Sequence, residues 1–242
     1  MKQIVWVLLA IAALALFFGD GSQSEETFRY KLTINVTVDG SAYSASSVIE
    51  ATQTRARSWW FGVSGSGASG GVYPEFTAKG VAPMITLPDG AVIFASLTGN
   101  HSDNPPGAKG ASVSHMPWLI YVDTWWAGTD RSKYKNLPVV PLPKETPRVE
   151  VPFEGHPKSK FRPAMRIAIP RRTDYSPVRW DFIGPSNASE RSGRAIDLIS
   201  FVIEPARDPL ITCIQPAPEW LVEARQEPRL QGTLRSLETC KG

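Results

Sequence analysis

The sequence predicts a mainly β protein, an antiparallel sandwich or a partly closed barrel, with an irregular proline-rich region and one short C-terminal helix. Three observations carry this prediction. An eleven-residue stretch alternates apolar and polar side chains, the pattern of a half-buried strand. Proline (21) and glycine (19) make up about a sixth of the 242 residues, which favours turns and short strands over long helices. Several further short apolar runs end at turn sequences.

A hairpin is predicted near the start of this β region. Phe28 to Val38 carries apolar side chains at every second position, so these side chains share one face of a strand. Asp39-Gly40 suits the two-residue turn of a right-twisted hairpin, because glycine accepts a positive φ. Tyr43 to Ala51 is then the returning strand.

Further strands are expected along the chain, and the earliest of them extend the hairpin into a meander of five or six strands. The candidates are Arg57–Val63, Tyr73–Lys79, Val81–Leu87, Ala91–Leu97, Met165–Ile169, Val178–Ile183 and Ile196–Ile203. Polar, turn-rich loops are expected over residues 99–114 and 186–193. Residues 118–122 are apolar, but the run is short.

Nine prolines lie between residues 138 and 177. Because proline lacks the N–H that a central strand donates, residues 138–177 are predicted to be an irregular cover or linker within a β-rich domain of residues 27–204. Residues 205–242 form a C-terminal segment in which Pro218 to Arg225 is the predicted helix, since proline suits a first turn and apolar residues share one face.

The first 21 residues are predicted to be a signal peptide or an N-terminal anchor. Lys2 precedes an apolar run from Ile4 to Phe18, and small and polar residues follow, which is the layout of an export signal. The alternative is an uncleaved anchor, because residues 4–18 would span roughly 23 Å as a helix and could cross a thin membrane. The protein is therefore expected in the periplasm or secreted, or held to the inner membrane by residues 4–18.

The two cysteines are predicted to be bridged, with two free thiols as the alternative. Cys213 and Cys240 are the whole complement, and an even count in an exported chain predicts a disulfide. Such a bridge would tie the C-terminal segment and contribute roughly 3 kcal/mol in the chain-entropy model.

Three segments together resemble an uncharacterised family of alphaproteobacterial exported or envelope proteins. They are the hairpin FRYKLTINVTVDGSAYSASSVIEA, the later ITLPDGAVIFASL, and IDLISFVIEPARDPLIT followed by PEWL. The resemblance implies the fold and a bacterial source. That family has no known activity, so the resemblance transfers no site residues.

Motifs that would indicate an enzyme are weak. Gly65 to Gly70 matches the G-x-G-x-x-G dinucleotide motif, but the residues after it are extended rather than helical, so no cofactor is predicted. Ser69 lies in a G-x-S-x-G motif, although a nucleophile elbow requires a strand-to-helix turn in an α/β sheet. Ser69, or a carboxylate pair, would be needed for the alternative function of an envelope hydrolase. The carboxylates available for a pair are Asp123, Glu150, Glu154 and Asp181.

No metal site is predicted, because His101, Asp103 and His115 are loosely spaced and a protein metal site needs three or four ligands in defined geometry. The net charge of +3 gives no reason to expect a nucleic-acid partner.

Aromatic and basic residues provide the candidate contact chemistry. Between Lys144 and Arg179 there are nine basic and four acidic residues, a local net charge of +5, which could attract anionic lipid or envelope polymers. Outward-facing tryptophans could contact partners, although core packing and a solvated surface are the ordinary interpretations. The candidate binding residues are Trp59, Trp125, Trp126, Lys158, Lys160, Arg162, Arg171 and Arg172.

The sequence therefore favours a non-catalytic binding or interaction module of the bacterial envelope over an enzyme. Its expected partners are envelope proteins, anionic lipid or an envelope polymer. The alternatives are the hydrolase described above and a small-molecule binder that uses the cavity of a β-barrel.

Overall fold

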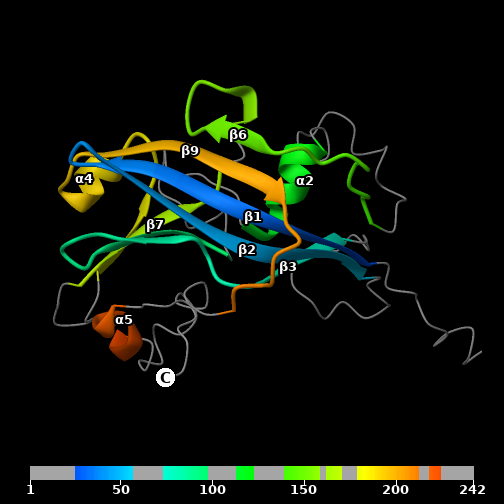
Figure 1. The fold of residues 1–242 in the computed structure, drawn as a ribbon, viewed down its shortest axis with the longest axis horizontal. Coiled ribbons are helices and arrows are strands. Elements are labelled where there is room, and N and C mark those ends of the chain that lie inside the picture. The colour runs from blue at the N-terminus through cyan, green and yellow to red at the C-terminus, as the bar shows by residue number, and fades with distance from the viewer. Residues whose placement is uncertain are drawn as a thin grey trace, which may run out of the picture.

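A computed structural model of the protein describes residues 25–56, 73–97, 113–122, 139–158, 162–170, 179–212 and 218–224. Within them, strands form two antiparallel sheets that pack together without closing into a barrel (Figure 1). One sheet has five strands in the order β3-β2-β1-β9-β6, and the other has four in the order β4-β5-β7-β8. The predicted sandwich is confirmed. The partly closed barrel is wrong, and the small-molecule binder loses the barrel cavity on which it was based.

The predicted hairpin forms the centre of the five-stranded sheet. Strand β1 (Glu25–Val38) pairs with β2 (Ser41–Ala56) along its whole length. Asp39 and Gly40 both have positive φ, at 50° and 80°, as the tight hairpin turn requires. The alternate apolar residues of β1 from Tyr30 onward are buried, because they face the second sheet and the helices beneath.

The other three strands of this sheet come from distant parts of the chain. β3 (Tyr73–Lys79) pairs with β2, while β9 (Ile196–Pro205) pairs with both β1 and β6 (Val149–Pro152). β6 lies inside the region that was predicted to be irregular. Proline is tolerated there because β6 is an edge strand and Pro152 is its last residue, where a missing N–H costs little.

The second sheet contains β4 (Met84–Thr86), β5 (Val92–Ala95), β7 (Met165–Ile169) and β8 (Arg179–Ile183). The expected meander of five or six strands is divided between the sheets: β1, β2 and β3 follow one another in one sheet, and the chain then crosses to the other, where β4 pairs with β5. The candidate strand at residues 57–63 lies outside the described residues.

Short helices occupy three segments. The 3-10 turn η1 (Val113–His115) leads into α2 (Met116–Tyr121). The short apolar run at residues 118–122 gives no prediction of this helix. The helix α4 (Ala188–Ser192) replaces part of the expected 186–193 loop. The predicted C-terminal helix is confirmed as α5 (Glu219–Ala224). No helix in the described part of the chain is long and apolar enough to cross a membrane.

The helix α2 closes one end of the core. Its residues from Met116 to Ile120 are all buried, and the indole Nε1 of Trp118 donates a hydrogen bond to the Val140 carbonyl at 2.8 Å. The buried Tyr30 hydroxyl of β1 donates to the Val113 carbonyl of η1 at 2.6 Å. Buried polar groups are thereby paired, and the 113–121 segment is fixed against the inner face of the large sheet.

Candidate functional site

The loop that follows edge strand β6 projects beyond the five-stranded sheet, at the top of Figure 1. We call residues 153–158 the β6 loop. Phe153 anchors it: the side chain is fully buried with its ring 5.6 Å from that of Phe201, and its N–H donates to the Ile199 carbonyl. Gly155, at φ 76°, turns the chain. Residues 154–157 are exposed, so the loop is a rigidly rooted, solvent-facing element.

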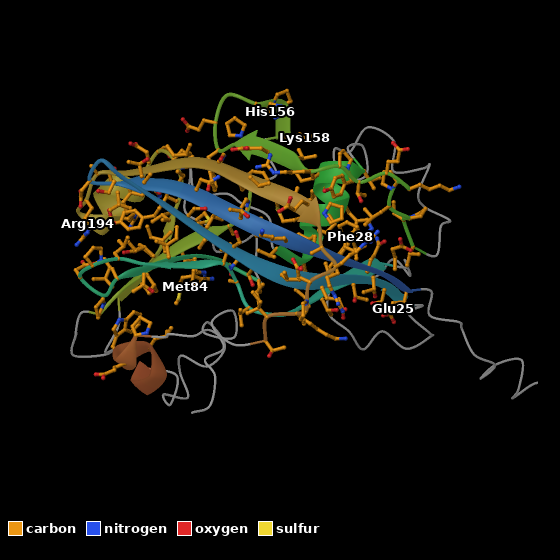
Figure 2. All side chains as sticks on the ribbon, in the orientation of Figure 1. Glu25, Phe28, Met84, His156, Lys158 and Arg194 are labelled. Carbon is orange, nitrogen blue, oxygen red and sulfur yellow. The ribbon has the colours of Figure 1, made fainter. Side chains whose placement is uncertain are left out.

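Lys158 fixes the other end of the β6 loop. Its ammonium Nζ donates to the Ile120 carbonyl at 2.7 Å, near the C-terminal end of α2. A cation is favourable there because the last carbonyls of a helix lack intrahelical partners. Its backbone N–H also donates to Nδ1 of His156 at 3.1 Å, and both residues lie at the top of Figure 2. Lys158, predicted to contact a ligand, therefore also holds the loop on α2.

Arg162 is the second predicted binding residue that the structure describes. Its side chain is half-buried, and burial lowers the pKa of its guanidinium, while the carboxylate of Glu154 in the β6 loop opposes that shift. Arginine nevertheless stays charged at any physiological pH. The β6 loop and its flank thus bring Glu154, His156, Lys158 and Arg162 into one neighbourhood.

The remaining predicted site residues lie outside the described residues. They are Trp59, Trp125, Trp126, Lys160, Arg171 and Arg172, together with Ser69 and the cysteines Cys213 and Cys240.

Three of the four carboxylates proposed for a hydrolytic pair are described, and each has a different cation as its partner. Glu150 lies 3.2 Å from Arg148, Asp181 lies 3.9 Å from Arg191, and Glu154 interacts with Arg162. Asp123 is outside the described residues.

The described histidines belong to different surroundings. His115 Nδ1 lies 3.1 Å from the Ser114 hydroxyl, and its ring packs 4.1 Å from that of Phe76, so it takes part in packing beneath β3. His156 belongs to the β6 loop. Across the described ranges, no group of three or more His, Cys, Asp or Glu residues could hold a metal ion.

The solvent face of the five-stranded sheet carries a polar network that sequence patterning predicts only as polar alternation. Ser44 and Ser200 both hydrogen-bond the Asn35 side chain, and Ser200 donates on to Glu150. Ion pairs flank this row: Arg29 and Lys79 share Glu50, while Lys31 and Arg148 share Glu204. The partners come from different strands, so the register and not the local sequence joins them.

Glu50 shows the electrostatic effect of this network. The hydrogen bond from Arg29 is the largest influence that holds the pKa of Glu50 below its usual value, and Lys79 acts in the same direction. This face is balanced in charge, because its four described cations are matched by four carboxylates: Arg29, Lys31, Lys79 and Arg148 against Glu25, Glu50, Glu150 and Glu204. It lacks the excess of cations that would make it an anion-binding surface.

The β6 loop and its flank combine three groups that can donate hydrogen bonds, the side chains of His156, Lys158 and Arg162, with one carboxylate, that of Glu154. An ammonium has three donors, and one of those of Lys158 is used at Ile120. The imidazole of His156 belongs to the same loop, and the guanidinium of Arg162 interacts with the Glu154 carboxylate of that loop. In comparisons with known proteins, no family model, no curated protein and no solved structure matches this chain.

Proposed function

We propose that the chain is an exported, non-catalytic binding module of the bacterial envelope, and that the β6 loop with its basic flank is its contact with anionic groups. The observation that carries this proposal is the placement of Lys158. Its ammonium is fixed at the end of α2 while the exposed residues before it project from the sheet edge. A preorganised loop loses little conformational entropy on binding.

The charge distribution of the sequence supports the same site. The β6 loop and Arg162 lie in the centre of the Lys144–Arg179 stretch, whose net charge is +5. Lys160 falls between two described residues of that site. A basic cluster gains about 1 kcal/mol per Lys or Arg held near an anionic membrane surface.

The N-terminal segment supports an envelope location. Its single Lys, apolar run and small-residue boundary match an export signal or an anchor. Fractionation of cells that express the full chain, with mass spectrometry of the mature N-terminus, tests this part. Recovery of the intact chain from the cytosol with Met1 still attached would contradict it.

Vesicle sedimentation tests the contact surface. The protein purified from the membrane or periplasmic fraction is mixed with vesicles of phosphatidylcholine, with or without phosphatidylglycerol, and soluble polyphosphate is tested as a competitor. We expect sedimentation with the anionic vesicles alone, weakened by salt. Arg162→Gln and Lys160→Gln should each reduce the affinity about fivefold, the equivalent of about 1 kcal/mol.

Lys79→Gln is the matched control, because Lys79 is a well-exposed cation on the balanced sheet face. Its affinity should equal that of the wild type. Competition by polyphosphate would point to a phosphate-bearing polymer as the ligand, and its absence to the lipid surface. Binding that is indifferent to both lipid charge and salt, or that falls equally in Lys79→Gln, would overturn the proposal.

A further inference from the structure

The chain crosses the solvent face of the large sheet after β9. We call residues 206–212 the strap. In Figure 1 it leaves the end of β9 and passes across β1 and β2. The Ala206 N–H donates to the Arg29 carbonyl at 3.1 Å at one end, and the Val81 N–H donates to the Ile211 carbonyl at 2.9 Å at the other. Between these two bonds the strap is largely exposed.

The strap covers a residue that does not fit its surroundings. The register places Val48 opposite Lys31, so its side chain belongs to the polar solvent face. Val48 is nevertheless only 4% exposed. The carbonyl oxygens of Val48 and Ile211 both lie within 3.3 Å of the position that a Cβ on Gly80 would take, so the strap passes beside Val48 and is the described segment placed to cover it.

The strap fits closely because of Gly80. This residue has φ 111°, and a Cβ on it would lie 2.9 Å from the Val48 carbonyl oxygen and 3.3 Å from that of Ile211. A side chain at this position would push the strap away from β2. The absence of a side chain at Gly80 therefore lets the strap lie close to β2. The two hydrogen bonds at its ends hold the strap in place.

We propose that the strap is a latch that opens locally while both sheets stay folded, and that its opening exposes the side chain of Val48 to solvent. Few buried contacts and an exposed backbone characterise segments that open below the free energy of global unfolding. In contrast, β1 is hydrogen-bonded on both sides, to β2 and to β9, and opens only when the sheet does. The latch stands independently of the anion-binding proposal.

Native-state hydrogen exchange on the full chain tests the latch, because both of its hydrogen bonds have an amide donor that can be followed. After correction for intrinsic rates, we expect the amides of Ala206 and Val81 to exchange on the order of 100-fold faster than those of Leu32 and Ile34, since local opening requires less free energy than global unfolding. Their exchange should also be insensitive to low concentrations of urea. Equal protection of all four amides would overturn the latch.

Thiol labelling gives a second, independent measurement. In the variant Val48→Cys the new thiol becomes reactive when the strap lifts, whereas in Val36→Cys, whose parent side chain is also buried in β1, it reacts only after the core opens. We expect labelling of Val48→Cys to be on the order of 100-fold faster under native conditions. Wild-type protein supplies the background from the natural cysteines. Equal labelling rates for the two variants would contradict the proposal.

Discussion

The guanidinium Nη2 of Arg194 lies 2.6 Å from a carboxylate oxygen of Asp89, and this contact joins the two sheets. Asp89 belongs to the turn between β4 and β5 in the four-stranded sheet. The same guanidinium lies 3.4 Å from Asp39, in the β1–β2 turn of the five-stranded sheet. The Asp39 turn is also bonded in both directions to the backbone of Ala195. One side chain therefore holds the hairpin turns of two sheets at the same end of the molecule.

Removing this link should lower stability measurably. Arg194→Met keeps most of the side-chain stem and loses both ion pairs, so we expect a loss of about 1 kcal/mol, the upper range for partly exposed pairs. The measurement is urea unfolding at low and high salt, and the difference from wild type should shrink at high salt because exposed pairs are screened. Lys144→Met is the control, since no ion pair is formed by Lys144 among the described residues. A salt-independent loss would assign the effect to packing of the stem.

The buried hydroxyl of Tyr30 should stabilise the fold. Tyr30→Phe removes the hydrogen bond to the Val113 carbonyl, which is expected to lower the free energy of unfolding by about 1 kcal/mol. Tyr43→Phe, on a half-buried side chain of β2, should have little effect. Denaturant unfolding of the two variants against wild type makes the comparison. Equal stabilities would show that the bond contributes nothing net.

Alkaline pH should destabilise the protein through the same residue. Burial raises the pKa of Tyr30 well above 10, and burial also raises the pKa of Tyr121 to about 12. The unfolded chain therefore loses these protons first, and their contribution to stability is complete below pH 10 and falls as the pH rises further. For Tyr30 the slope is at most about 1.4 kcal/mol per pH unit. Unfolding from pH 8 to 11 should show this slope reduced in Tyr30→Phe, and an unchanged slope would contradict it.

The Glu50 carboxyl should titrate below its usual range. Its pKa is lowered first by the hydrogen bond from Arg29 and then by Lys79, so its contribution to stability is present at neutral pH and is lost as the pH falls through the folded-state pKa. Side-chain carboxyl chemical shifts give the midpoint directly. Arg29→Gln should raise the midpoint more than Lys79→Gln does. The reverse order would mean that charge proximity outweighs the hydrogen bond.

Gly80→Ala should destabilise the fold more than an equivalent change in open space. Gly193 also has positive φ but nothing within 4 Å of an added Cβ, so Gly193→Ala measures the backbone strain alone, about 1–2 kcal/mol. Gly80→Ala adds the close approach to the Val48 carbonyl and a φ of 111°, which lies beyond the left-handed region, and we expect a further loss of about 1 kcal/mol or more. Thermal unfolding of the two variants measures the loss of stability in each. Equal losses would show that the close approach at Gly80 contributes nothing.

Sequence patterning predicts the local parts of this structure well. Period-two alternation and the Asp39-Gly40 turn located the hairpin, and the α5 helix and the strand at Met165–Ile169 fall where proposed. The same reasoning missed β6, because the many prolines of the 138–177 region outweighed a four-residue edge strand. It missed α2 because one buried turn of helix has no polar face to show a period.

For the candidate site, the sequence predicts only a cluster of basic residues and not the contacts that those residues make. The ammonium of Lys158 binds the backbone carbonyl of Ile120, 38 residues away, and a carbonyl acceptor has no residue type that a pattern can reveal. Arg194 and Asp89 are likewise separated by more than a hundred positions, so no local pattern indicates that they form an ion pair. Such pairs follow from how the sheets are stacked, which is decided after the strands have formed.

The position of β9 has a kinetic consequence. It fills the gap between β1 and β6, and its residue Ser200 bonds Asn35 from 165 positions away. Until the ribosome and any translocation machinery have delivered that late segment, one side of β1 remains an unpaired edge open to other chains. The five-stranded sheet therefore cannot be completed until β9 has been synthesised. Before that point the unpaired edge of β1 makes the chain most prone to aggregate.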